Sequence, residues 1–200
     1  MKKMGLTGGV ASGKSTVAAM LLEMGFPVLE ADLVAHELME PGQEAYDEIL
    51  QEFGKELVDE KGRIDRAKLA AIVFADPEKL AKLNRIIHPR VEEITFQQFR
   101  QWEKDGVGDA GFVAAALLVE AGFAEKLDGL VVTFCRPEQQ LERLRARGMS
   151  ETEARRRIAA QMPVEEKLKY ATERIDCSGT MRDTRAQVEA LTKRLRGSTL

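Results

Sequence analysis

Apolar residues recur along the chain at two spacings, and these spacings predict helices and strands. From 15 to 24 apolar side chains fall at i, i+3, i+4 and i+7, and Gly25 follows where a left-handed helix cap belongs. Two other runs, 112–120 and 129–135, are almost continuously apolar. Such runs are typical of parallel strands that helices cover on both faces. We therefore expect a buried sheet with helices packed against it.

Residues 33 to 107 show helical spacing without strand-like alternation. Asp65 is an expected N-cap, and Asp76 is another because Pro77 follows it in the first turn. We expect His88–Pro89 to end the helix that starts there, with a further helix beyond it. This stretch is therefore predicted to be an all-helical insertion.

Weaker strand candidates at 4–6, 27–30 and 174–175 complete the order of elements. The order is strand, helix, strand, helical insertion, two strands, helix, strand and helix. Such an alternation predicts an α/β fold with a core parallel sheet.

Composition and charge limit the classes of function. Of the 200 residues, 44% are apolar and 32% are charged, as in a folded globular protein, and the formal net charge is −3. Because this charge gives no global attraction for nucleic acid or anionic membranes, any anion site must be built locally. Cys135 and Cys177 lack the spacing of a zinc site or a disulfide framework. With no signal-like or membrane-spanning apolar run, we expect a cytoplasmic protein without nucleic-acid or membrane partners.

One short stretch carries the strongest chemical signal. The pattern GxxxxGK[ST] begins at Gly8 and ends at Lys14 and Ser15, between a strand candidate and a helix. Glycines let successive backbone N–H groups converge on a phosphate, and the following helix adds its positive end. Lys14 would contact the β- and γ-phosphates, and Ser15 would ligate Mg²⁺. The loop residues expected to bind ATP are Gly8, Gly9, Val10, Ala11, Ser12, Gly13, Lys14, Ser15 and Thr16.

The rest of the chain narrows the class of nucleotide-binding protein. A GTPase would add D-x-x-G after an apolar strand, but Asp59 and Asp105 begin this pattern in polar turns, and the N-K-x-D base-recognition motif is absent from the sequence. A motor ATPase would favour paired acids at the end of an apolar strand, whereas the run 112–120 ends in Glu120 alone. The remaining class is a small kinase that moves the γ-phosphoryl group to a bound acceptor.

Such a kinase needs three further parts, and the sequence offers a candidate for each. Asp32 follows a strand candidate, where a carboxylate can orient the acceptor hydroxyl; capping of the next helix would also explain it. Residues 136–157 hold seven arginines against four acids, and Arg143 and Arg147 lie one turn apart as a cationic lid that would bind ATP. For 155–157 a solvated charged face is the better explanation. The helical insertion supplies a pocket for the acceptor.

These features resemble the dephospho-CoA kinase family along nearly the whole chain. The loop motif is shared with many ATPases, whereas the ordered set of segments is far more specific. The matching segments are GLTGG-x-x-SGKST at 5–16, Ala31-Asp32, Glu40-Pro41-Gly42, Gly62-x-Ile64-Asp65-Arg66, Ile72-Val73-Phe74, His88-Pro89-Arg90, Leu117-Leu118-x-Glu120, Gln140-x-x-Arg143-x-x-x-Arg147, Ala160-Gln161 and Ile175-Asp176-x-x-Gly179.

The resemblance implies ATP-dependent phosphorylation of the ribose 3′-hydroxyl of dephospho-coenzyme A, the last step of coenzyme A synthesis. We expect a monomer or weak homo-oligomer. It implies a three-layer P-loop NTPase fold with core segments 1–32, 108–137 and 166–200, an acceptor-binding insertion at 33–107 and a lid at 138–165. The implied catalytic residues are Lys14, Asp32, Arg143 and Arg147. The implied acceptor-binding residues are Thr7, Asp32, His88, Arg90 and Glu120.

Three positions depart from the family pattern. Ala114 and Ala116 stand where the family often has an aspartate and a proline. A metal-linked carboxylate is therefore missing from that strand, so Mg²⁺ must rest on Ser15, the phosphates, water and either Asp32 or Glu120. Cys177 stands where the family commonly has an asparagine near the adenine.

Two alternatives stay open. One is another small-acceptor kinase, acting on a nucleoside monophosphate or a metabolite alcohol. The other is a nucleotide-binding regulator without catalysis. Retention of Asp32 and both lid arginines speaks against the regulator, because a sensor needs no acceptor base.

Overall fold

The structure of the protein is a computed structural model that describes residues 1–197. The chain divides into two compact units. The first unit holds Met1–Glu30 together with the chain from Gln98 onward, and the second holds Ala31–Gln97. No helix in the described part of the chain is both long enough and apolar enough to cross a membrane.

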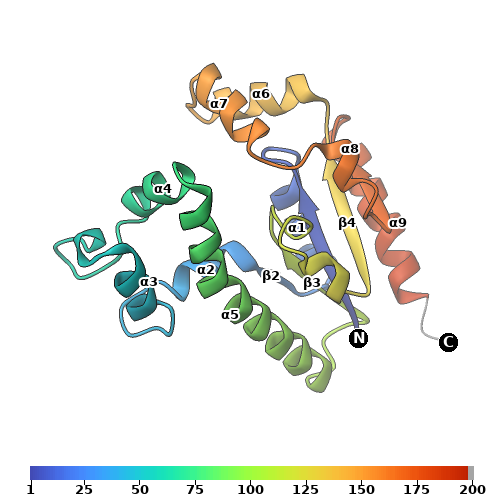
Figure 1. The fold of residues 1–200 in the computed structure, drawn as a ribbon. Helices are drawn as coiled ribbons and strands as arrows, with labels where there is room; N and C mark the ends of the chain where they lie inside the picture. Colours follow the sequence, from blue (N-terminus) through green and yellow to red (C-terminus); the bar gives the residue numbers. More distant parts are fainter. Residues whose placement is uncertain (198–200) are drawn as a thin grey trace. The chain divides into compact units, whose positions relative to one another are not determined.

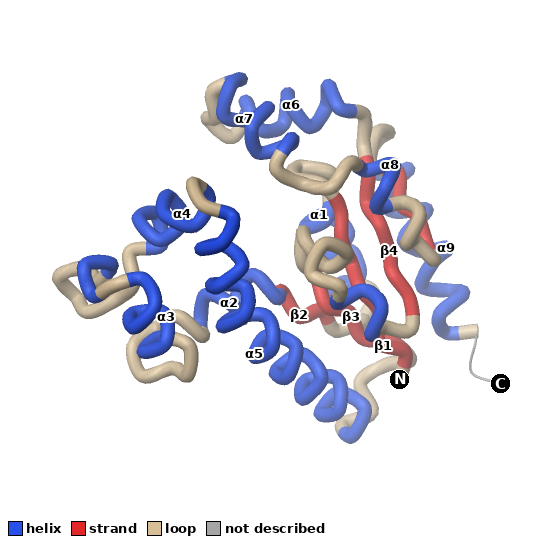
Figure 2. Tube along the Cα trace, in the orientation of Figure 1, coloured by secondary structure: helices blue, strands red, loops and turns tan. Residues whose placement is uncertain are grey.

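The first unit is built around a five-stranded sheet in which every neighbouring pair is parallel (Figures 1 and 2). The strand order is β2-β3-β1-β4-β5, which confirms the expected α/β fold. The register pairs Gly8 with Thr133 and Phe134 with Asp176, so these strands end at one edge of the sheet. The strands are β1 (Lys2–Gly8), β2 (Val28–Glu30), β3 (Ala110–Ala114), β4 (Gly129–Phe134) and β5 (Glu173–Asp176).

β1 and β3 differ most in length from the predicted strands. β1 begins at Lys2, because Lys2 and Lys3 pair with Ala110 and Gly111 of β3 even though both lysines are polar. β3 ends at Ala114, so the prediction of a strand over 112–120 is wrong in its second half. The apolar run continues because the loop that follows is itself packed inward, with Leu118 and Val119 buried.

Helices complete the first unit. Apolar side chains of α1 and α9 join those of the sheet in one core, where the rings of Phe26 and Phe112 meet edge to face at 6.1 Å. α6 and α7 lie side by side beyond the end of β4 (Figures 1 and 2). The helices of this unit are α1 (Lys14–Glu23), η2 (Phe123–Lys126), α6 (Pro137–Ala146), α7 (Glu151–Ala159), α8 (Val164–Lys167) and α9 (Met181–Arg196).

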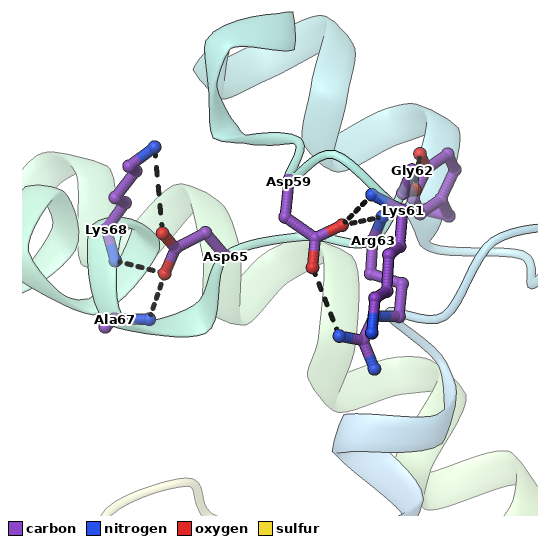
Figure 3. Close-up of polar contacts among 8 residues, drawn as sticks. Asp59, Lys61, Gly62, Arg63, Asp65, Ala67 and Lys68 are labelled. Atoms are coloured by element: carbon purple, nitrogen blue, oxygen red, sulfur yellow. Dashed lines mark hydrogen bonds and ion pairs between the residues drawn. The ribbon is translucent and has the colours of Figure 1, made fainter.

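The second unit is helical, as the sequence predicts, and aspartate side chains organise one of its turns and cap the starts of some of its helices. Asp65 accepts hydrogen bonds from the backbone N–H groups of Ala67 and Lys68, which confirms it as an N-cap (Figure 3). In the preceding turn Asp59 accepts from the N–H groups of residues 61 and 63 (Figure 3). The helices are α2 (Ala31–Glu37), α3 (Tyr46–Phe53), η1 (Lys55–Leu57), α4 (Arg66–Phe74) and α5 (Pro77–Lys104), the last reaching into the first unit.

α5 corrects one prediction. The sequence predicts that His88–Pro89 ends a helix, yet α5 continues through Pro89. A proline inside a helix removes one N–H donor from the i→i−4 ladder. The N–H that Pro89 lacks would have paired with the carbonyl of Arg85. The neighbouring carbonyl, of Ile86, accepts an extra hydrogen bond from the Arg90 guanidinium at 2.6 Å. The capping role of Asp76 is confirmed, because its carboxylate accepts from the N–H groups of residues 78 and 79.

Candidate functional site

The glycine-rich loop joins the end of β1 to the start of α1, as the motif predicts. Gly13 is the N-cap of α1 and has φ +107°, and no side chain caps the helix at this end. A Cβ at Gly13 would lie 2.6 Å from Cys177 Sγ, so a glycine is required both for the turn and for the close approach. The first-turn N–H groups of α1 are therefore left for a ligand, in the manner of an anion-binding helix start.

Ala11 carries the backbone strain of this loop. Its φ is +58°, and it is the single non-glycine residue with a positive φ in the part of the chain that the structure describes. Such conformations cost of order 1–3 kcal/mol and persist where neighbouring contacts over-determine them. Beneath the loop the Ser12 and Thr133 hydroxyl oxygens lie 2.8 Å apart. Because Thr133 donates its own proton to the Thr7 carbonyl, Ser12 is the donor in this buried pair.

The arginine-rich segment contacts the loop directly. Arg143 donates one hydrogen bond to the Ala11 carbonyl at 3.0 Å and another to the Cys177 carbonyl at 2.7 Å. Two glutamines that the sequence analysis assigned no role also reach the loop. Gln140 donates to the Val10 carbonyl at 2.9 Å, and Gln161 accepts from the Val10 N–H at 2.7 Å. Their partners lie more than a hundred residues away in sequence, so local pattern could not reveal these contacts.

A cavity of about 240 Å³ opens beside the loop in the first unit. It brings Arg143 and Arg147 together with the loop, although Arg147 belongs to the C-cap of α6 rather than to its body. Burial raises the pKa of the Cys177 thiol to about 11, and the nearby Arg143 guanidinium acts in the opposite direction. The residues lining the cavity are Ala11, Gly13, Thr16, Arg143, Arg147, Cys177, Gly179, Met181 and Thr184.

Lys14 begins α1, and its ammonium lies 3.4 Å from the Glu30 carboxylate at the end of β2. The Lys14 side chain is 14% exposed, so its charge is held at the inner end of the loop rather than in bulk water. Glu30 lies 16 residues from Lys14, so no local pattern marks it as the partner. Ser15 is exposed on the first turn of the same helix.

Thr7 and Glu120 hold the loop that follows β3. Thr7 is fully buried, and its hydroxyl donates to the Ala116 carbonyl at 3.1 Å. The Glu120 carboxylate accepts from the Met162 N–H at 3.1 Å and pairs with the Lys167 ammonium at 2.9 Å. Lys167 is 0% exposed and also donates to the Ala116 carbonyl. No sequence signal marked Lys167, because it stands in a polar helix beside the exposed Lys169.

The remaining predicted site residues lie in the second unit. Asp32 is exposed in the first turn of α2, which begins directly after β2. His88 lies inside α5, where burial lowers its pKa. Arg90 pairs with Glu48 at 2.5 Å, and its Nε lies 3.7 Å from a Glu44 carboxylate oxygen.

The donor set of the loop fits Mg²⁺. In residues 1–197, no group of three or more His, Cys, Asp or Glu side chains is placed to hold a metal ion. Mg²⁺ is usually bound through one or two protein oxygens together with substrate phosphates and water, rather than by an all-protein cage. The exposed hydroxyl of Ser15, next to the glycine-rich turn, suits that arrangement.

Comparisons with known proteins agree with one another. The family model for dephospho-CoA kinase matches residues 3–183. The dephospho-CoA kinase of Bacillus anthracis is 44% identical over 191 residues, which cover 95% of each chain. The solved dephospho-CoA kinase of Campylobacter jejuni is 27% identical, with a TM-score of 0.73 over 99% of this chain and 98% of that one. A Thermus thermophilus crystal structure is 35% identical, with a TM-score of 0.84 over 97% of both chains.

Proposed function

The chain belongs to the dephospho-CoA kinase family, and from this premise we propose that it transfers the γ-phosphoryl group of ATP to the ribose 3′-hydroxyl of dephospho-coenzyme A. The observation that carries the proposal is the contact between Arg143 and the glycine-rich loop. One guanidinium bridges the Ala11 and Cys177 carbonyls and lines the cavity beside the loop. This contact supports a site that combines backbone N–H donors for the phosphates with a cationic lid.

In this proposal the ATP phosphates lie on residues 8–16 and the adenosine occupies the cavity beside them. The N–H groups at the start of α1 and the Lys14 ammonium supply positive potential for the phosphates. Cys177 replaces the family asparagine near the base. As a neutral thiol it offers a weak donor and an apolar surface rather than an amide.

Mg²⁺ accompanies the nucleotide in the proposed complex, with Ser15 as its protein ligand. When bound, the ion neutralises charge that develops on the phosphate oxygens. The further carboxylate ligand is proposed to be Asp32 or Glu120. Glu120 already accepts from the Met162 N–H and pairs with Lys167, so a metal ion would have to share its carboxylate with these two partners.

Asp32 is proposed to orient the acceptor hydroxyl and to take its proton late in the transfer. In a loose, metaphosphate-like transition state the acceptor hydroxyl keeps its proton until late in the transfer. Orientation of the hydroxyl is therefore the larger contribution of Asp32 to catalysis. Arg143 and Arg147 are proposed to stabilise the charge of the transferring group. A lid formed by 138–165 would exclude water, so that phosphate goes to the acceptor.

The acceptor is proposed to use His88 and Arg90 of the second unit. Arg90 already contacts two glutamates, so an anionic group of the acceptor would have to compete with Glu44 and Glu48 for it. Thr7 and Glu120 are proposed to act through the backbone of residues 116–120, because Thr7 has no exposed surface. We place the reaction in the cytoplasm, carried out by a monomer or weak homo-oligomer.

An acceptor panel tests this function. Purified protein is incubated with MgATP and, separately, dephospho-coenzyme A, AMP, adenosine or shikimate, and the products are identified by mass spectrometry. We expect phosphorylation of dephospho-coenzyme A at a kcat/KM at least about a hundredfold above the others. Turnover of another acceptor at a comparable kcat/KM would show that dephospho-coenzyme A is not the preferred substrate. ATP binding without transfer to any acceptor would favour a nucleotide-binding regulator.

A further inference from the structure

Val10, in the middle of the glycine-rich loop, has both of its backbone hydrogen-bonding groups taken by glutamine side chains. Its N–H donates to Gln161 Oε1 at 2.7 Å, and its carbonyl accepts from Gln140 Nε2 at 2.9 Å. The chemistry fixes the orientation of both amides, because an N–H needs an oxygen and a carbonyl needs an NH₂ group. The two glutamines therefore make different and complementary contacts with one residue.

The two glutamines come from opposite ends of the α6–α7 segment. Gln140 lies in α6, and Gln161 lies two residues beyond the end of α7. The twenty residues between them include most of α6, with Arg143 and its C-cap Arg147, and all of α7. Both ends of this helical segment are therefore fastened to the same point of the phosphate-binding loop.

The neighbouring residues are consistent with a built contact. A Cβ at Gly9 would lie 2.6 Å from Gln140 Nε2, so the loop has a glycine where the glutamine passes closest. Gln140 is only 9% exposed. On the other side, Gln161 is followed by Met162, whose N–H is bound by Glu120. The contact is thus supported on both sides rather than formed by two mobile surface chains.

We infer that Gln140 and Gln161 are positioning residues that hold the glycine-rich loop in its phosphate-binding conformation and couple it to the arginine-bearing helices. The strained residue Ala11 follows Val10 directly and is held on its other side by Arg143. Without the Val10 contacts, Ala11 can relax out of the left-handed region, and the N–H groups of the loop lose their convergence. The inference rests on the proposed function for the reaction that the loop serves, but not for the effect of the glutamines on MgATP binding.

Two substitutions test the coupling. Gln140→Met and Gln161→Met keep side-chain length and remove the amide, and Gln101→Met serves as the control because Gln101 is an exposed residue of α5 that bonds to Asp105. We expect each test variant to weaken MgATP binding about 5- to 20-fold by calorimetry, the scale of one lost hydrogen bond with its consequences. KM for ATP should rise more than KM for the acceptor, and Gln101→Met should match wild type.

A third substitution separates positioning from general packing. Glycine adopts a positive φ without strain, so a loop with Ala11→Gly needs less support from Gln161. Ala11→Gly in the background of Gln161→Met should therefore recover at least about a third of the lost MgATP affinity. The comparison with Ala11→Gly alone completes a double-mutant cycle. Because Gln140→Met lies at a buried site and could unfold, Gln161→Met, at a partly exposed site, carries the test by itself.

The outcomes are distinct from those of the proposed function, since calorimetry with MgATP needs no acceptor and no turnover. Tight MgATP binding by wild type with no transfer to dephospho-coenzyme A would remove the proposed function and leave this inference testable. An MgATP affinity of Gln161→Met within twofold of wild type would overturn the inference. So would strict additivity with Ala11→Gly.

Discussion

The Lys167 ammonium lies 2.9 Å from the Glu120 carboxylate, and the same ammonium donates to the Ala116 carbonyl. Lys167 is 0% exposed, whereas the Glu120 side chain is 24% exposed. This pair joins the loop after β3 to α8, the short helix that follows α7. Lys167 is therefore a fully buried cation in the same unit as the proposed phosphate site.

Lys167→Met should destabilise the protein. Removing one partner of a buried ion pair leaves the other uncompensated, at a typical cost of 3–5 kcal/mol; we expect about 3 kcal/mol because water reaches Glu120. Lys169→Met is the matched control, because its pair with Glu166 is exposed and worth less than about 1 kcal/mol. Urea unfolding monitored by circular dichroism gives both free energies. Equal losses for the two variants would contradict a structural role for the buried pair.

Asp32→Asn should abolish most turnover while leaving MgATP binding near wild type. A positioned base typically contributes 10²- to 10⁴-fold, so we expect kcat to fall at least about a hundredfold. Asp47→Asn, at an exposed position in the first turn of α3, is the control and should keep kcat within about twofold. Steady-state kinetics and calorimetry separate the two effects. A kcat near wild type for Asp32→Asn would leave this aspartate only the role of an acidic residue in the first turn of α2.

Arg143→Ala should lower kcat by about a thousandfold, the effect of positioned arginines in phosphoryl transfer. Arg143→Lys should recover only part of the loss, because one ammonium cannot span the Ala11 and Cys177 carbonyls as a planar guanidinium does. Arg145→Ala, on the exposed side of the same helix, is the control. If Arg143→Lys had full activity, charge alone would suffice and the bridging geometry would be irrelevant.

Alkaline pH should destabilise the protein through Cys177. Burial raises the pKa of this thiol from an ordinary value near 9 to about 11, so the folded state favours the neutral thiol. The contribution to stability is fully present below pH 9 and is lost as pH rises from 9 through 11. In Cys177→Ser the free energy of unfolding should decline less steeply over pH 9–10.5, with parallel slopes below pH 8. Identical slopes throughout would contradict the raised pKa.

Local sequence chemistry predicted the local structure well. Asp65 and Asp76 cap helices as expected, and Gly25 has the positive φ expected of a residue at a helix end. These features depend on a few neighbouring residues, so a short window contains all the information they need. The parallel sheet was also predictable, because near-continuous apolar runs between helices have few other solutions.

Features that depend on distant partners were not predictable. Pro89 continues inside α5, where the Arg90 side chain donates to a backbone carbonyl of the preceding turn, and the sequence expectation of a helix end was wrong. The apolar run after β3 packs as a loop rather than a strand. Lys167, Gln140 and Gln161 acquire their contacts only when segments separated by 51 to 151 residues meet. The family resemblance named both glutamines without suggesting what they touch.

The most direct test of the central claim is ADP formation measured with and without dephospho-coenzyme A, for wild type and for Lys14→Ala. We expect wild-type protein to form ADP together with an equal amount of coenzyme A, and to form it only slowly when the acceptor is omitted. Lys14→Ala should lose most of this activity. ADP formation that does not respond to the acceptor, or that survives in Lys14→Ala at the wild-type rate, would contradict it.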